Sequence, residues 1–259
     1  MKILYKNAPI FYKLNGQGPV VVFIHGFLED SSMWDYTIKS CQKVSTLVVD
    51  LPGHGKSDHF NDIHTMDQMA LIVKAILDKH QITTATFVGH SMGGYVALAL
   101  AQNFPEYITK LILVNSTPLA DSAERLKNRR QAIKLLEQLP ERFIAMAIQN
   151  LFDPENLEKL QPTIDILKSK AVKLNPKGVI ACVKGMMARP DRTATLTAIK
   201  APKIVIASQK DPIIDCQIMA TLSLKAGAQF VLLPGGHMSP FEQPKRLNDL
   251  LQHYLNYCT

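Results

Sequence analysis

Short apolar runs alternate with longer amphipathic segments along most of the chain. The runs are rich in Val, Ile and Leu and lack polar alternation, so we expect strands that are covered on both faces. The predicted buried strands are Val20–Ile24, Thr46–Val49, Thr86–Val88, Leu111–Val114, Ile204–Ala207 and Phe230–Leu233. Apolar residues at helical spacing fill the segments between them. The predicted helices are Ser32–Lys39, Met66–His80, Met92–Asn103, Cys216–Ala226 and Pro244–Tyr257.

This alternation is typical of an α/β fold with a mostly parallel central sheet and helices on both faces. Near the N-terminus, Leu4–Lys6 and Ile10–Leu14 predict a hairpin, with its turn at Asn7 and Pro9. The hairpin would add an antiparallel edge to the sheet.

The alternation stops between residues 119 and 189, where the pattern is helical, as in Arg125–Leu139 and Glu141–Asn150. An insertion of helices after the sixth strand would cover the strand ends, where open α/β sheets bind ligands. We therefore predict a core formed by residues 1–118 and 190–259, and a helical lid formed by residues 119–189.

Composition and charge narrow the class of protein. Of the 259 residues, 47% are hydrophobic and 20% are charged, which is typical of a globular protein with a sizeable core. Lysines interrupt the N-terminal apolar residues, and no uncharged stretch is long enough to span a bilayer, so we expect a cytoplasmic protein. The net charge of +7 is spread along the chain without an aromatic-interleaved basic motif, which disfavours nucleic-acid binding. The pattern has no signature of oligomeric state.

The strongest chemical signal lies in residues 87–94, FVGHSMGG. Gly89, Ser91 and Gly93 fit G-x-S-x-G, which holds a serine on a sharp turn between a strand and a helix. Glycine is needed at both positions because a side chain there would collide with the neighbouring strand or helix. The alternative interpretation is a loop of small residues with Ser91 as the helix N-cap.

A serine hydroxyl needs a base that takes its proton and a third group that orients the base. On such a sheet the acid and then the histidine follow the serine, each just past a later strand. Asp211 follows the strand Ile204–Ala207, and His237 follows the strand Phe230–Leu233. We therefore predict a triad of Ser91 as nucleophile, His237 as base and Asp211 as acid.

Other acids and histidines have competing structural interpretations. Asp211 could instead open a turn with Pro212. The rival acid Asp215 sits further past the strand and is expected to cap the next helix. The histidines expected to be solvated are His59 and His64 in a polar loop and His80 and His253 on helices.

The oxyanion of an acyl-transfer intermediate needs two N–H donors. One is expected from the backbone of Met92. The other is expected from the backbone of Phe27, where Gly26 lets the chain turn inwards. Trp34, the only tryptophan, follows this loop and could line the pocket, although packing in the core is the commoner role for such a residue. The candidate side chains for the substrate pocket are His25, Trp34 and Tyr95.

Five ordered motifs together resemble the α/β-hydrolase superfamily. They are HGF at 25–27, DLPGHGKSD at 50–58, GHSMGG at 89–94, KDP at 210–212 and GGHMSPFEQP at 235–244. The resemblance covers essentially the whole chain except the lid. It implies the same nucleophile, acid, base and oxyanion donors, with no metal and no organic cofactor. The second motif would form a structural loop near the mouth of the site.

Within this superfamily, a serine at position 91 favours acyl transfer over dehalogenases and epoxide hydrolases, whose nucleophile is aspartate. The chain resembles small carboxylesterases, so we expect a small-molecule ester, thioester or lactone as substrate. A menaquinone-pathway lyase that closes a succinyl-cyclohexadiene carboxylate shares three motifs, but its pattern has an arginine where this chain has Tyr95. A ligand-binding member without turnover is the alternative from a different class.

The predicted lid contains arginines that have two interpretations. They could bind an anion in place of the missing arginine at position 95, or they could form a solvated helix face. The arginines concerned are Arg125, Arg129, Arg130, Arg142 and Arg189.

Overall fold

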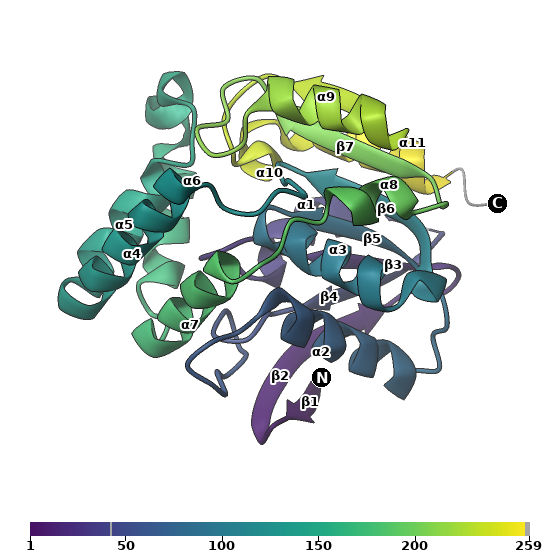
Figure 1. Ribbon diagram of the computed structural model, residues 1–259, viewed down its shortest axis with the longest axis horizontal. Helices are drawn as coiled ribbons and strands as arrows, with labels where there is room; N and C mark the ends of the chain where they lie inside the picture. The colour runs from purple at the N-terminus through teal and green to yellow at the C-terminus, as the bar shows by residue number, and fades with distance from the viewer. Residues whose placement is uncertain (42, 257–259) are drawn as a thin grey trace.

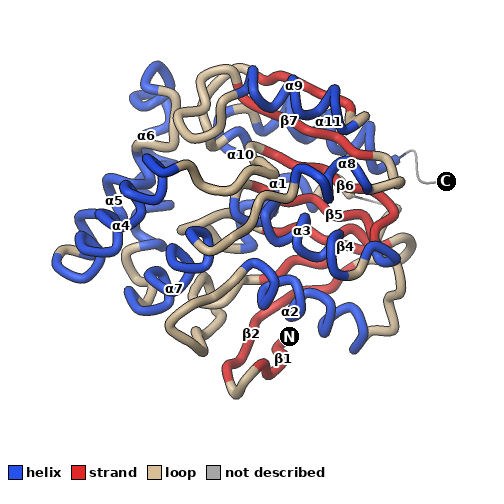
Figure 2. The backbone as a smooth tube through the Cα atoms, viewed as in Figure 1, coloured by secondary structure: helices blue, strands red, loops and turns tan. Residues whose placement is uncertain are grey.

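An eight-stranded sheet forms the centre of the protein (Figure 1 and Figure 2). The computed structural model describes residues 1–41 and 43–256. The strands are β1 (Lys2–Tyr5), β2 (Ala8–Asn15), β3 (Val20–Ile24), β4 (Ser45–Val49), β5 (Ala85–His90), β6 (Ile108–Val114), β7 (Lys203–Ser208) and β8 (Gln229–Leu233). Their spatial order is β1-β2-β4-β3-β5-β6-β7-β8. The contacts of β2 with β1 and β4 are antiparallel and the other pairs are parallel, so the predicted mostly parallel sheet is confirmed.

Helices cover both faces of this sheet. They are η1 (Ser31–Trp34), α1 (Asp35–Ile38), α2 (Met66–Lys79), α3 (Met92–Asn103), η2 (Pro105–Tyr107), α4 (Ala123–Gln138), α5 (Pro140–Gln149), η3 (Pro154–Asn156), α6 (Leu157–Ala171), α7 (Pro176–Met187), α8 (Thr193–Ala198), α9 (Cys216–Ala226), α10 (Ser239–Glu242) and α11 (Pro244–Asn256). The predicted end of the last helix at Tyr257 lies outside the described residues. None of the described helices is both long and apolar enough to cross a bilayer.

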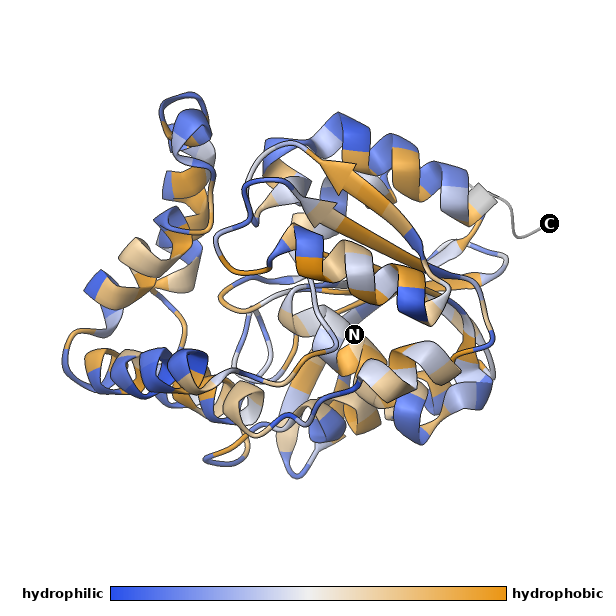
Figure 3. Cartoon of the chain, turned by 45° about the horizontal axis from the view of Figure 1, so that its top comes forward, coloured by the Kyte–Doolittle hydropathy of each residue, from blue (hydrophilic) through white to orange (hydrophobic). Residues whose placement is uncertain are grey.

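Alternate residues of each buried strand feed two apolar cores. In β3, Val22 and Ile24 join the core under α2 and α3, whereas Val21 and Phe23 join the core under α11. Val21 to Ile24 are all buried because both faces of the sheet are covered there, which explains the continuous apolar run in the sequence. Figure 3 shows hydrophobic residues concentrated in the strands and hydrophilic residues along the outward faces of the helices.

The carboxyl ends of the parallel strands meet at one edge of the sheet. The strand register pairs His90 of β5 with Val114 of β6, and Val114 with Ile206 of β7. It also pairs Ser208, at the end of β7, with Leu233, at the end of β8. The loops that follow these four strands therefore leave the sheet side by side.

The N-terminal hairpin differs from the prediction in its turn. Lys6 and Asn7 have φ values of 49° and 67°, as a two-residue hairpin turn of the mirror-image type requires. Pro9 lies inside β2 and pairs with Leu4 of β1. The turn is therefore at Lys6 and Asn7, so the prediction was right for Asn7 and wrong for Pro9.

Helices α4 to α7 are inserted between β6 and β7. In Figure 1 these helices lie together beside the sheet, with α4 packed on α5 and α7, and α5 packed on α6. One contact of this insertion buries His64, which was expected to be solvated. The His64 Nδ1 lies 3.4 Å from the Sγ of Cys182 in α7, and burial lowers the pKa of His64 to about 4.

A glycine sets how closely α7 approaches the loop before α2. A Cβ at Gly185 would lie 1.7 Å from the carbonyl oxygen of His64. We expect Gly185→Ala to lower the free energy of unfolding by about 1–3 kcal/mol, because the backbone must shift. The higher helix propensity of alanine would by itself raise the free energy of unfolding by up to about 1 kcal/mol. The sign of the measured change therefore shows whether the collision or the propensity is larger.

Urea denaturation of the wild type and the variant measures this difference. The matched control is Lys184→Ala, at the neighbouring and partly exposed position in α7, with an expected change within about 0.5 kcal/mol. A Gly185→Ala variant at least as stable as the wild type would show that this contact does not constrain the insertion.

Candidate active site

Ser91 occupies a strained turn between β5 and α3. Its φ and ψ are 48° and −115°, a conformation that non-glycine residues rarely adopt. Ser91 N donates to Val114 O over 3.0 Å, and Ser116 Oγ donates to Ser91 O over 2.8 Å. Ser91 occupies the N-cap position of α3, but its side chain makes no capping hydrogen bond to that helix.

The glycines around Ser91 leave no room for side chains. A Cβ at Gly89 would lie 2.6 Å from the backbone of Gly93. A Cβ at Gly93 would lie 2.2 Å from the carbonyl oxygen of Ile24 in β3. The expected collisions with a neighbouring helix and strand are therefore both present, and they explain the G-x-S-x-G spacing.

Three side chains from separate strand ends form one hydrogen-bonded chain. The His237 Nε2 lies 2.8 Å from Ser91 Oγ, and the His237 Nδ1 lies 2.8 Å from Asp211 Oδ2. Since a carboxylate only accepts, Nδ1–H donates to Asp211 and leaves Nε2 to accept from the Ser91 hydroxyl. The side chains of His237 and Asp211 are 3% and 1% exposed, so solvent competes little for these bonds.

The surroundings of Asp211 stabilise its ionised form. Its Oδ1 accepts from the backbone N–H groups of Ile213 and Ile214 over 2.8 and 2.9 Å, and its Oδ2 accepts from Asn115 Nδ2 over 2.9 Å. Burial alone would raise the pKa of Asp211. The interactions with His237 and these donors outweigh burial and lower the pKa.

Asp215 has the capping role expected for it. Its carboxylate accepts from Gln217 N and Ile218 N over 2.8 and 3.0 Å at the start of α9. The rival acid is therefore committed to a helix end, and Asp211 alone contacts the histidine.

The two predicted oxyanion donors remain available. Among the described residues, the backbone N–H groups of Phe27 and Met92 donate to no protein acceptor. The left-handed residue in this loop is Leu28, with φ of 64°, and not Gly26. Gly26 instead makes room, since a Cβ there would lie 2.7 Å from the Glu29 carboxylate and 2.8 Å from His90 Nδ1.

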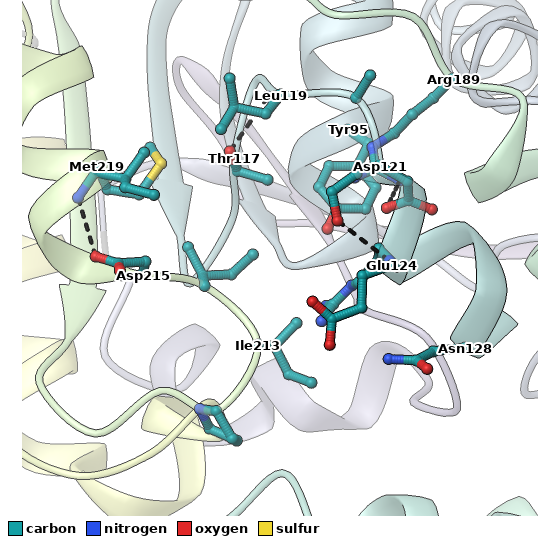
Figure 4. Close-up of a pocket in the computed structure, with 16 residues that line it drawn as sticks. Tyr95, Thr117, Leu119, Asp121, Glu124, Asn128, Arg189, Ile213, Asp215 and Met219 are labelled. Atoms are coloured by element: carbon teal, nitrogen blue, oxygen red, sulfur yellow. Dashed lines mark hydrogen bonds and ion pairs between the residues drawn. The ribbon is translucent and has the colours of Figure 1, made fainter.

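A cavity of about 90 Å³ opens onto Ser91 and His237. Its apolar walls are Phe27, Leu151, Met186 and Ile213. A larger cavity of about 410 Å³ adjoins it and shares Tyr95, Arg125 and Ile213 (Figure 4). Tyr95 therefore lines both cavities.

The structure does not bring the other two predicted pocket side chains to this cavity. Trp34 is fully buried in the second core, where its ring lies 5.3 Å from that of Phe23. His25 is also fully buried, and its Nε2 accepts from Leu51 N over 2.8 Å. Both side chains are fully buried and line neither cavity, so their assignment to the pocket was wrong.

A buried ion pair behind His237 was not predicted. The His90 Nδ1 lies 3.0 Å from Glu29 Oε2, and the His90 Nε2 lies 3.0 Å from the carbonyl oxygen of His237. Both ring nitrogens face acceptors, which requires the imidazolium form. Burial opposes that form, but Glu29 outweighs burial and raises the pKa of His90, while His90 lowers the pKa of Glu29. The sequence held two signals of this ion pair. Glu29 is an acid in the loop after β3, and His90 is a histidine next to Ser91.

The loop that carries His237 is fastened to the inserted helices. His237 N donates to Leu151 O over 2.8 Å. Glu242 accepts from Gly236 N over 3.0 Å and from Asp153 N over 3.1 Å, joining the two segments. The position of the imidazole therefore depends on the insertion as well as on the sheet.

The polar side chains also include types that can ligate a metal ion. Within residues 1–41 and 43–256, no group of three or more His, Cys, Asp or Glu side chains is arranged to hold a metal ion. A serine hydroxyl, an imidazole and a carboxylate in one hydrogen-bonded chain are groups that acyl transfer can use.

Comparisons with known proteins agree with this geometry. The family model described as the alpha/beta hydrolase fold matches residues 19–244. The 3-oxoadipate enol-lactonase 2 of Acinetobacter baylyi is 28% identical over 95% of this chain and 93% of its own length. The pimeloyl-[acyl-carrier protein] methyl ester esterase of Vibrio vulnificus is 26% identical over 92% of this chain and 95% of its own length.

Solved structures share the architecture. A thermophilic esterase from Thermogutta terrifontis, determined with malate bound, superposes with a TM-score of 0.91 at 29% identity, covering 96% of this chain and 94% of that one. The enol-lactonase from Burkholderia xenovorans superposes with a TM-score of 0.91 at 22% identity, covering 99% of this chain and 100% of that one, which supports the fold alone.

The Glu29–His90 pair predicts a pH-dependent stability. Because the pKa of His90 is raised, the pair's contribution is fully present below the ordinary value of 6.5 and is lost as pH rises through the raised value. We expect Glu29→Gln to lower the free energy of unfolding by about 3 kcal/mol at about pH 6. The loss becomes smaller as the pH is raised to about 9.

Urea denaturation at several pH values measures this dependence. The control is Lys245→Gln, which removes the exposed ion pair with Asp249 and should leave stability nearly unchanged at every pH. A Glu29→Gln loss that stays constant or grows with rising pH would contradict a charged pair.

Proposed function

This chain belongs to the α/β hydrolase fold family, and from that premise we propose that it cleaves a small or medium carboxylic ester, thioester or lactone through an acyl-enzyme on Ser91. Its family, and relatives named as an enol-lactonase and a methyl ester esterase, make it a carboxylic ester hydrolase. The observation that supports the mechanism is the unbroken chain of hydrogen bonds from Ser91 through His237 to Asp211.

In the first half-reaction the Ser91 Oγ attacks the acyl carbonyl carbon while His237 Nε2 takes the hydroxyl proton. Asp211 holds the imidazole in the required orientation and stabilises the imidazolium that forms. The negative charge develops on the carbonyl oxygen, where the N–H groups of Phe27 and Met92 donate to it. His237 then gives the proton to the leaving group as the bond to the acyl carbon breaks.

In the second half-reaction water replaces the leaving group. His237 takes a proton from the water as its oxygen attacks the acyl carbon of the Ser91 ester. The second tetrahedral intermediate uses the same two N–H donors. Its collapse returns the proton to Ser91 Oγ and releases the carboxylic acid. These steps need only this chain's own groups and water.

We further propose that residues 119–189 act as a helical lid on a core formed by residues 1–118 and 190–259. Arg125 and Arg129 of α4, Leu151 and Met186 all line the Ser91 cavity, and all come from this insertion. The lid therefore determines the size and polarity of the acyl pocket. A cavity of about 90 Å³ favours short acyl groups over long ones.

Substitution of the proposed nucleophile tests the mechanism. The wild type should react with a fluorophosphonate probe and hydrolyse short p-nitrophenyl esters. Ser91→Ala should lose the labelling and lower kcat by about 10⁴-fold or more, because a triad acts as a unit. The control is Ser169→Ala, an exposed serine of α6, which should keep both properties.

Each other outcome favours a specific alternative. A wild type that is not labelled and hydrolyses no p-nitrophenyl ester would contradict the proposal and favour a ligand-binding protein without turnover. Efficient elimination on the menaquinone-pathway intermediate with negligible ester hydrolysis would favour the lyase. Labelling that persists in Ser91→Ala would place the nucleophile elsewhere.

A further inference from the structure

Three guanidinium groups gather beside the Ser91 cavity around one buried carboxylate. Arg129 Nε lies 2.5 Å from Asp121 Oδ2, and Arg189 Nη1 lies 2.8 Å from Asp121 Oδ1. Arg189 also lies over the ring of Tyr95 at 4.1 Å, and Figure 4 shows these two side chains beside Asp121. Asp121 is 1% exposed and is fully engaged by the two arginines.

The third guanidinium, that of Arg125, has no carboxylate partner. Within the described ranges, no acidic oxygen lies within 4.0 Å of its nitrogen atoms. Arg125 is four residues before Arg129, so the two side chains share one face of α4. Burial is the main cause that lowers the pKa of Arg125; the charges of Arg129 and Arg189 lower it further, whereas Tyr95 and Asp121 act in the opposite direction.

The other acidic groups near the cavity do not neutralise this excess. Glu29 lines the Ser91 cavity but is paired with His90. Glu124 is exposed and lines only the outer cavity, and Asp215 is engaged at the start of α9. Three arginines against one carboxylate, that of Asp121, therefore leave the wall of the cavity positively charged.

Four of the five lid arginines divide between the two interpretations raised by the sequence, and the fifth, Arg189, is engaged by Asp121. Arg130 and Arg142 are exposed and form part of a solvated surface. Arg125 and Arg129 line the same small cavity as Ser91 and His237. Apolar walls beside these two groups exclude water and strengthen their attraction for an anion.

We propose that Arg125 and Arg129 form a carboxylate subsite, so that the preferred substrates are esters, thioesters or lactones whose acyl group itself carries a carboxylate. This inference rests on the proposed function. A planar guanidinium binds a carboxylate through two parallel hydrogen bonds, which positions as well as attracts the group. The cavity shared with Ser91 is small, so the carboxylate lies only a few bonds from the scissile carbonyl. The adjoining cavity of about 410 Å³ has room for the leaving group.

The test compares two esters that differ in one charge. The probes are mono-p-nitrophenyl succinate, which carries a free carboxylate, and its methyl-capped counterpart, which is neutral. We expect the wild-type kcat/KM to be about tenfold higher for the anionic ester. Arg125→Gln should reduce this ratio to about one, Arg125→Lys should retain part of it, and the exposed control Arg130→Gln should keep the wild-type ratio.

Inhibition of the wild type gives a second measurement that needs no variant. Succinate should compete with the neutral ester, more strongly than uncharged succinamide does, and added salt should weaken this competition. Hydrolysis of both esters without preference for the anion, or a ratio unchanged in folded Arg125→Gln, would overturn the subsite and leave the proposed function intact. Equal inhibition by succinate and succinamide would also overturn it. Hydrolysis of neither ester would instead defeat the proposed function.

Discussion

The site depends on the fixed position of one imidazole. Ser91 and Asp211 hold the two ring nitrogens of His237, and His90 donates to its backbone carbonyl. Leu151, from the inserted helices, accepts from its backbone N–H. A base held on all of these sides loses little freedom during proton transfer, which is the advantage of a preorganised site. The sheet, the loop after β3 and the insertion all contribute to this position.

Charge is arranged around this imidazole in an ordered way. One buried carboxylate, that of Asp211, accepts from its Nδ1. A second buried carboxylate, that of Glu29, is paired with His90, whose other ring nitrogen donates to the His237 carbonyl. On the cavity side the charge is reversed, because Arg125 and Arg129 outnumber the acids that reach them. In the proposed mechanism, the negative charge on the acyl oxygen develops beside this cationic wall. Burial makes each of these interactions stronger than it would be in water.

Strand order and motif spacing were enough to predict the sheet, the strained serine turn and the convergence of Ser91, His237 and Asp211, because parallel strands bring their carboxyl ends to one edge. Side-chain pairing across long separations was not predictable in the same way. His90 and Glu29 are 61 residues apart, and neither has a pattern of its own. Burial of polar residues also escaped prediction, as with His25, because a polar loop can lie beneath other segments that the local sequence does not reveal.

The covalent intermediate offers the most direct measurement of the central claim. Wild-type enzyme is mixed with p-nitrophenyl acetate, quenched in acid within the first turnover, and digested for peptide mass spectrometry. The expected result is an acetyl group on the Ser91 hydroxyl, appearing as fast as p-nitrophenol is released. Turnover without any acetylated peptide, or acetylation of a different side chain, would contradict a nucleophilic Ser91 activated by His237.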